Sequence, residues 1–148
     1  NSNNNNISSN TDKILPTEIT INEQLTELNI YFCTKLNSNA LWKIANRCTK
    51  LESLNIARCY SITANKNINA LKALTGLPLK ELSLSLDPSI DKEMALEVLE
   101  LFMHDDFFTE LKKLDLSIGC EILNKIESAL QDLKESRQIL LQVPKKSR

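Results

Sequence analysis

A six-residue phrase with Leu or Ile at its first, fourth and sixth positions occurs four times in this chain of 148 residues. The phrases start at Leu25, Leu51, Leu79 and Leu111, so the repeating units are about 30 residues long. A unit of this size cannot bury its own apolar face and is stable only when it is stacked on its neighbours. Stacking predicts one continuous core and one open surface formed by the variable positions of the phrase. Such a surface favours binding over chemistry.

Each phrase predicts a short strand, because its fourth and sixth residues, such as Leu28 and Ile30, share one side at a period of two. The stretch after each phrase changes to helical apolar spacing. Polar residues and Gly-x-Pro mark the expected helix ends. The expected N-caps are Ser38 or Asn39 in the first unit and Asp91 in the third, and the expected stop in the second is Gly76 with Pro78 behind it. A fourth helix is expected over 122–134 and a fifth strand over 138–143.

Alternating strands and helices also occur in doubly wound α/β sheets. That alternative is disfavoured because the strands repeat one phrase and no Gly-rich phosphate turn follows any of them. The predicted fold class is therefore α/β, a Leu-rich solenoid of parallel strands and helices over residues 14–143. Residues 1–13 contain one apolar side chain and are expected to be a disordered or linker tail, and 144–148 a polar tail.

The composition excludes some classes of partner. A net charge of −1, from 18 basic and 19 acidic residues, gives no electrostatic reason to expect nucleic acid or an anionic membrane. No apolar run approaches the roughly 18 residues that cross a bilayer. The four cysteines, Cys33, Cys48, Cys59 and Cys120, are spread without a C-x-x-C pair, which favours reduced, buried thiols and a cytoplasmic location.

Residues 25–63 resemble the cysteine-containing subtype of leucine-rich repeats, which is related to ribonuclease-inhibitor-like repeats. The first unit carries the strand phrase, then Cys33, then a helix with Ile44, Ala45 and Cys48. The second carries the phrase followed by Cys59 and by Ile62-Thr63. In the third unit Leu86-Asp87-Pro88 replaces the cysteine segment, and in the fourth Cys120 falls one residue late, so the resemblance is looser there.

The resemblance implies a right-handed solenoid with a concave parallel sheet and convex helices, which binds a protein and has no catalytic residues and no cofactor. The first functional hypothesis is therefore a protein-interaction module. The alternative is the substrate-recognition part of a ubiquitin-ligase subunit, or a pathogen effector that imitates one in the host cytoplasm; ubiquitin-ligase components would then be partners. Residues 15–19, Leu-Pro-Thr-Glu-Ile, resemble the opening of an F-box, but the remainder of an F-box does not fit before Leu25. A capping segment or a coincidence are the other interpretations.

An enzyme is the third and least favoured hypothesis. Cys33 and Cys59 share a register, which predicts two small buried side chains stacked in a turn; a disulfide is geometrically conceivable. Zinc is excluded because four convergent ligands are needed. His104, the single His, is either a general base between carboxylates or the end of a helix, where a cation suits the dipole. No metal site is expected.

The predicted binding surface consists of residues that flank the inward leucines. The rows across the sheet are Glu27, Ser53, Glu81 and Lys113; Asn29, Asn55, Ser83 and Asp115; and Tyr31, Ala57, Ser85 and Ser117, with Gln138, Leu140 and Gln142 from the fifth strand. Asn29 and Asn55 form either a side-chain ladder or part of the binding surface. The predicted binding hot spot is Tyr31 with Arg58 and Tyr60. Phe107 and Phe108 are a second anchor or part of the core.

Overall fold

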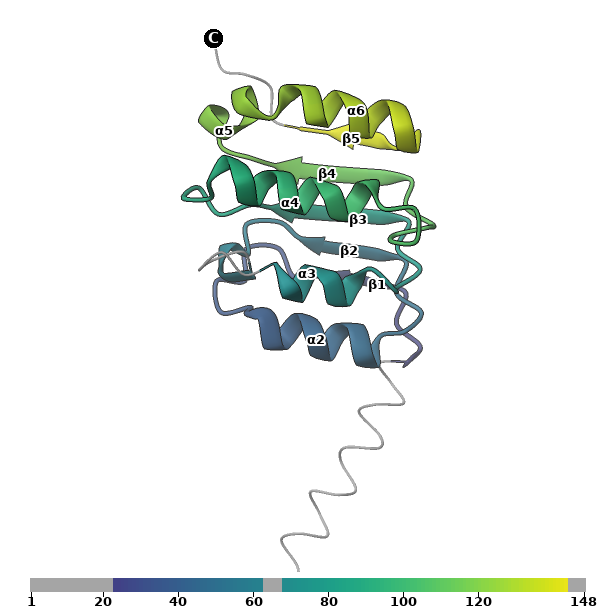
Figure 1. Ribbon diagram of the computed structural model, residues 1–148. Helices are drawn as coiled ribbons and strands as arrows, with labels where there is room; N and C mark the ends of the chain where they lie inside the picture. The colour runs from purple at the N-terminus through teal and green to yellow at the C-terminus, as the bar shows by residue number, and fades with distance from the viewer. Residues whose placement is uncertain (1–22, 63–67, 144–148) are drawn as a thin grey trace, which may run out of the picture.

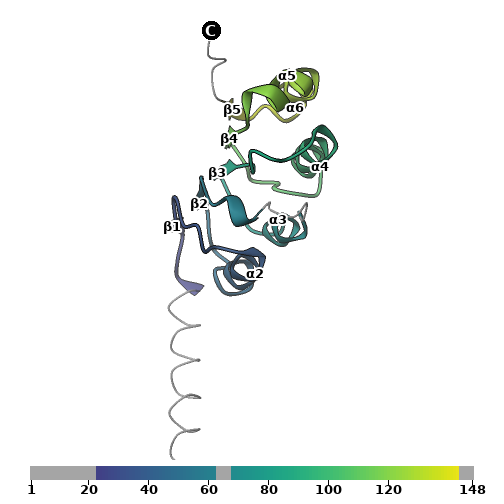
Figure 2. The same ribbon diagram turned by 90° about the vertical axis from the view of Figure 1, so that its left-hand side faces the viewer.

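The computed structural model describes residues 23–62 and 68–143. The predicted tails 1–13 and 144–148, the segment 14–22 and Thr63 lie outside this part of the chain. The fold is α/β, with one parallel five-stranded sheet in which each strand lies next to the one that follows it in the sequence (Figure 1). All the labelled helices cover one face of this sheet, and no described helix covers the other (Figure 2).

The strands are short, and the first four lie within or overlap the repeated phrases. They are β1 (Glu27–Asn29), β2 (Ser53–Ile56), β3 (Glu81–Ser85), β4 (Lys113–Ser117) and β5 (Leu140–Gln142). Their register joins equivalent phrase positions, because Leu28 lies opposite Leu54, Leu54 opposite Leu82, and Leu82 opposite Leu114. This register confirms the alignment that the phrases predict. The fifth strand is shorter than predicted, because Gln138 is not part of it but ends the preceding helix in a left-handed conformation with φ 53°.

The helices differ from the expected ones at their ends. They are α2 (Ser38–Arg47), the 3-10 turn η1 (Tyr60–Ile62), α3 (Asn69–Leu74), α4 (Lys92–Met103), α5 (Cys120–Lys125) and α6 (Glu127–Arg137). Asp91 caps α4 as predicted, because its carboxylate accepts a hydrogen bond of 2.9 Å from the Met94 backbone N–H. None of the described helices has the length and apolar character needed to cross a membrane.

Three predicted helix boundaries are wrong. The N-cap of α2 is Asn37, whose side-chain oxygen accepts from the Ala40 N–H at 3.1 Å, rather than Ser38 or Asn39. The helix α3 ends at Leu74, and Gly76 has no left-handed φ, so it is not a glycine C-cap. The helix predicted over 122–134 is two helices, α5 and α6, separated at Ile126 with φ −117°.

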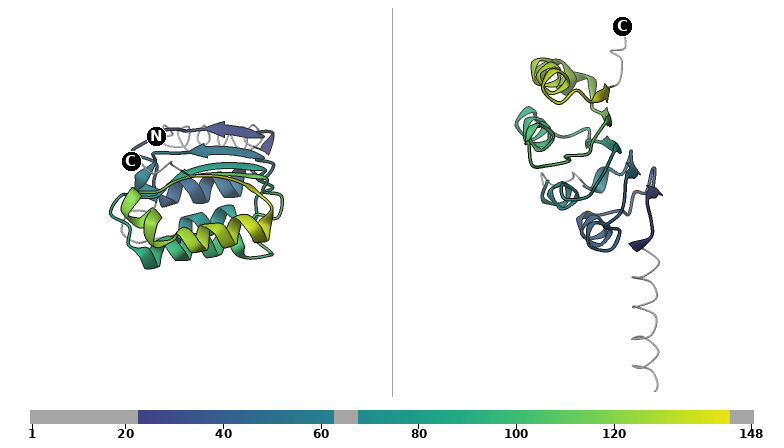
Figure 3. Two further views of the ribbon diagram at one scale, coloured as in Figure 1. Left: turned by 90° about the horizontal axis from the view of Figure 1, so that it is seen from above. Right: turned by 90° about the vertical axis from the view of Figure 1, so that its right-hand side faces the viewer.

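The core lies between the sheet and the helix layer, which stack unit upon unit (Figure 3). The central phrase residues Leu54, Leu82 and Leu114 are at most 1% exposed. The long return segment after α4 contributes Phe108, which is buried and stacks on Phe102 with 4.8 Å between ring centroids. Phe108 is therefore a core residue and not a binding anchor.

Arg137, near the end of α6, binds the backbone of that return segment. Its guanidinium donates to the carbonyl oxygens of His104, Phe107 and Phe108 at 2.9, 3.1 and 2.8 Å. These hydrogen bonds have a charged donor, and such bonds contribute more than neutral ones. They attach the return segment after α4 to α6, the last helix.

Replacing Arg137 with alanine is expected to lower the free energy of unfolding by about 2 kcal/mol, because three carbonyls lose a charged donor. Arg137→Lys is expected to recover less than half of the loss, since one ammonium cannot reproduce the planar fork of a guanidinium. Urea unfolding followed by circular dichroism measures both. Equal stability of Arg137→Ala and the intact protein would contradict this role.

Candidate functional site

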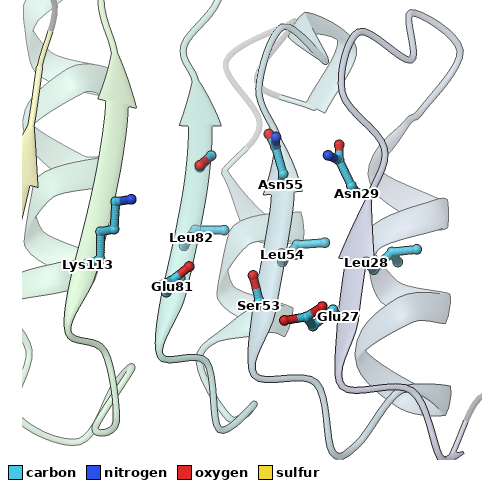
Figure 4. A pocket seen from close by; sticks show the side chains of 10 residues that line it. Glu27, Leu28, Asn29, Ser53, Leu54, Asn55, Glu81, Leu82 and Lys113 are labelled. Carbon is cyan, nitrogen blue, oxygen red and sulfur yellow. The ribbon is translucent and has the colours of Figure 1, made fainter.

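The sheet face without helices carries the variable positions of the strands, and we call it the open face. Its members are Glu27, Asn29, Ser53, Asn55, Glu81, Ser83, Lys113, Asp115, Leu140 and Gln142. A depression of about 450 Å³ crosses it from β1 to β4, with polar side chains around it and Leu28, Leu54 and Leu82 at its base (Figure 4). The structure therefore brings the two main predicted rows together on one surface.

The first row carries two acidic residues and one basic residue across the strands. Glu27 lies opposite Ser53, and Ser53 opposite Glu81, which in turn lies opposite Lys113. β5 adds Leu140, whose side chain is 59% exposed. The second row runs from Asn29 through Asn55 and Ser83 to Asp115 and ends at Gln142. Together the two rows carry three carboxylates and one ammonium group, so the open face is negative.

The two asparagines of the second row have a local structural role. The side-chain oxygen of Asn29 accepts from the Tyr31 N–H at 3.1 Å, and that of Asn55 accepts from the Ala57 N–H at 3.0 Å. Both are Asx turns, in which the side chain replaces a backbone acceptor where the strand ends. The asparagine oxygens therefore shape the strand ends, and the side-chain hydrogen bonds of these two residues run to the backbone two residues further along the chain rather than from one amide NH₂ to the other amide oxygen.

The third predicted row is only partly present on the surface. Tyr31 and Ser117 are exposed, but Ser85 is 1% exposed. Its hydroxyl accepts a hydrogen bond of 2.9 Å from the backbone N–H of Arg58 in the preceding unit. Ser85 thus satisfies a backbone donor inside the stack, and its predicted place on the binding surface is wrong.

An exposed cluster lies where the first two strands end. The Arg58 guanidinium carbon is 5.8 Å from the centroid of the Tyr31 ring, and Tyr31 is 52% exposed. Phe32, at 57% exposure, has its ring centroid 6.3 Å from that of Tyr31. We call Tyr31, Phe32 and Arg58 the aromatic corner. Of the predicted hot spot, the structure brings Tyr31 and Arg58 together, whereas Tyr60 is half-buried in η1.

Phe32 was not predicted as part of the surface, although the sequence carries a signal for it. Phe32 and Arg58 both immediately precede the cysteine of their unit, and both are left-handed, with φ 58° and 59°. The Phe32 N–H donates to the Ala57 carbonyl at 2.9 Å, so neighbouring units hold this turn in the same form. Because Phe32 and Arg58 occupy equivalent positions in their units, an exposed Arg58 predicts that Phe32 is exposed as well.

All four cysteines are free thiols, in different surroundings. Cys48 and Cys59 are buried as predicted, Cys33 is half-buried, and Cys120 is exposed, which contradicts the prediction for that residue. The Cys59 sulfur donates to the Ile30 carbonyl of the preceding unit at 3.1 Å. Burial raises the pKa of the Cys59 thiol, and also that of Cys48, where the nearby Arg47 charge partly opposes the shift.

These raised pKa values predict a loss of stability in alkali. Below the ordinary thiol pKa of 9.0 both states are protonated. As the pH rises above it, the unfolded thiols lose their protons while the folded ones keep theirs, so the free energy of unfolding falls. Urea unfolding between about pH 7 and 10 measures the fall. The free energy of unfolding is expected to fall less in the Cys48→Ala/Cys59→Ala variant. An identical fall in both proteins would show that these two thiols are not its cause.

No group of three or more His, Cys, Asp and Glu side chains in residues 23–62 and 68–143 is placed to hold a metal ion. His104 is the C-cap of α4. Its Nδ1 accepts from the Asp106 N–H at 3.2 Å, and its ring stacks on Phe107 with 4.1 Å between centroids. The interpretation of His104 as the end of a helix is therefore confirmed.

Comparisons with models of known families, with curated proteins and with solved structures find no match to this chain. Its function is therefore inferred from its own surface.

Proposed function

We propose that this chain is a solenoid of the leucine-rich-repeat kind that binds a protein partner through its open face and the adjoining aromatic corner, without catalysis. One observation carries the proposal. Five parallel strands leave a whole face of side chains uncovered by any described helix, while the helices lie on the other face. Residues on such a face can vary without disturbing the core, as a recognition surface requires.

The size and composition of this surface suit a protein partner. A standard interface buries about 800 Å² on each partner, so a protein partner needs an extended surface rather than a deep pocket. The depression on the open face is shallow and crosses four strands, and its outer residues are small or charged. Aromatic and arginine side chains dominate binding energy at interfaces, and Tyr31, Phe32 and Arg58 supply them at one end.

The charge of the open face favours a partner with basic residues. Glu27, Glu81 and Asp115 outnumber Lys113, and Glu81 is the register neighbour of Lys113. Complementary charge increases the association rate and selects against acidic partners. The buried free thiols Cys48 and Cys59 are compatible with a reducing compartment, so a cytoplasmic location is part of this proposal.

Affinity capture followed by mass spectrometry tests the proposal, with the intact protein beside a Glu27→Lys/Glu81→Lys/Asp115→Lys variant. A partner with a basic contact surface is expected to be lost in the variant, while its thermal melting curve remains close to that of the intact protein. A variant with Glu93→Lys, Glu97→Lys and Glu100→Lys on α4 makes the same change of charge on the helix side and should retain the partner. Retention by the open-face variant and loss by the α4 variant would move binding to the helices.

The same experiment addresses the ubiquitin-ligase alternative. Its supporting motif, residues 15–19, lies outside the described residues. A ligase adaptor recruited through that motif would be captured by both proteins, whereas a substrate bound on the open face would be captured by the intact protein alone.

A further inference from the structure

The helices that cover the sheet carry opposite charges in different units. The helices α2 and α3 contain no acidic residue, and their exposed lysines are Lys43 and Lys72. The helix α4 contains one lysine and three glutamates, and all three glutamates are exposed: Glu93, Glu97 and Glu100. The helix layer is therefore basic over the first two units and acidic over the third.

These five charges are not neutralised in the described part of the chain. Within residues 23–62 and 68–143 none of them forms a salt bridge, whereas Lys80 pairs with Glu52 and Lys125 with Glu121, each at 3.0 Å. The glutamates of α4 are three or four residues apart, a spacing at which like charges destabilise a helix. Positive charge from another molecule would relieve this repulsion.

The helix layer also exposes apolar side chains. Among the described residues five large apolar side chains are exposed, and Tyr31, Phe32 and Leu140 belong to the aromatic corner and the open face. The other two are Trp42 on α2, at 44% exposure, and Met103 at the end of α4, at 38%. The basic part and the acidic part of the helix layer thus each present one apolar anchor.

We propose that the helix layer is a dimerisation surface, and that its partner is a second copy of this chain related by a twofold axis parallel to the helices, between α3 and α4. The helices α2, α3, α4 and α6 lie side by side in chain order (Figure 1). This axis places α2 and α3 of one copy against α4 of the other, and the same contact forms a second time by symmetry.

The charges select this arrangement over the other twofold one. A twofold axis across the helices would place each helix on its own equivalent, so lysines would face lysines and glutamates would face glutamates, which costs free energy. The helix layer lies on the opposite side of the sheet from the open face (Figure 2). Dimerisation is therefore independent of what the open face binds.

Sedimentation velocity of the full chain tests the proposal at concentrations from about 1 µM to about 1 mM, which span the range of weak interfaces. The intact protein is expected to change from monomer to dimer as its concentration rises, and high salt is expected to weaken the dimer. Lys43→Glu/Lys72→Glu is expected to raise the dissociation constant of the dimer at least about tenfold, because both symmetric contacts then bring like charges together. Circular dichroism shows whether each variant is folded.

Two further variants separate this contact from an effect of net charge. Adding Glu97→Lys/Glu100→Lys to the lysine variant restores both the net charge and the complementarity, so the dimer is expected to recover. Lys50→Glu/Lys112→Glu makes the same change of net charge at exposed positions outside the helices, in the connections before β2 and β4. It is expected to leave the dimer unchanged.

The proposal is overturned if the intact protein stays monomeric over this range of concentration, or if the Lys43/Lys72 variant dimerises as strongly as the intact protein. A folded fourfold variant that does not recover the dimer would refute the pairing of these helices. An equal loss in the Lys50/Lys112 variant would assign the effect to net charge alone and would also overturn the proposal.

Discussion

Replacing Tyr31 and Arg58 with alanine is expected to weaken binding of the captured partner about 1,000-fold, because anchors of this type each contribute about 2 kcal/mol at an interface. The two side chains are exposed and contact each other, with the Arg58 guanidinium 5.8 Å from the Tyr31 centroid. Their backbone bonds to Asn29 and Ser85 remain in the variant, so the turn that presents them is retained. Isothermal titration calorimetry measures the change in Kd.

Trp42→Ala is the matched control for this variant. Trp42 is also a large exposed aromatic residue, at 44% exposure, but it lies on α2 in the helix layer. It is expected to change Kd less than twofold. A loss of affinity in Trp42→Ala together with unchanged affinity in the Tyr31/Arg58 variant would place the partner on the helices and refute the open-face proposal.

Leu82→Ala is expected to lower the free energy of unfolding by about 3 to 5 kcal/mol. Leu82 is 1% exposed in the central strand β3, between Leu54 and Leu114, so its truncation leaves a cavity that neighbours on both sides cannot fill. Urea unfolding followed by circular dichroism measures the loss. This change is comparable to the whole stability of many domains, and partial unfolding at 37 °C is the expected consequence.

Leu140→Ala removes the same atoms from a leucine of β5 that is 59% exposed, and it is expected to cost less than about 1 kcal/mol. Because both variants replace leucine with alanine, the difference between their losses of stability measures the effect of burial alone. Equal losses in the two variants would show that β3 is not the centre of a continuous core.

Much of the fold follows from the repeated phrase. Its spacing predicts parallel strands in chain order, and the register of Leu28, Leu54, Leu82 and Leu114 confirms this alignment. The same register places Glu27, Ser53, Glu81 and Lys113 in one row, as the sequence predicts. A period of two along a strand and a constant phrase between strands leave little freedom, because a slip by one residue would expose every leucine.

Three features could not be predicted from single positions. Ser85 has the pattern of a surface residue, but the Arg58 N–H of the neighbouring unit draws it into the interior. The α5–α6 break at Ile126 interrupts a continuous helical pattern, and Ile126 itself is 1% exposed. Asn37 rather than Ser38 caps α2, since N-cap preferences among Asn and Ser differ too little to decide between neighbours.

Local periodicity was enough to predict the strands, the inward leucines and the residues of the two main surface rows, because it specifies which side of a strand each residue takes. The polar side chains that are left to contact a partner could be identified only in the folded chain. Asn29 and Asn55 use their oxygens to close turns, Ser85 is buried, and Tyr31 is joined by Phe32 and Arg58. The turns at Asn29 and Asn55 are local, whereas the burial of Ser85 and the contact of Arg58 with Tyr31 join neighbouring units and form only when the stack is assembled.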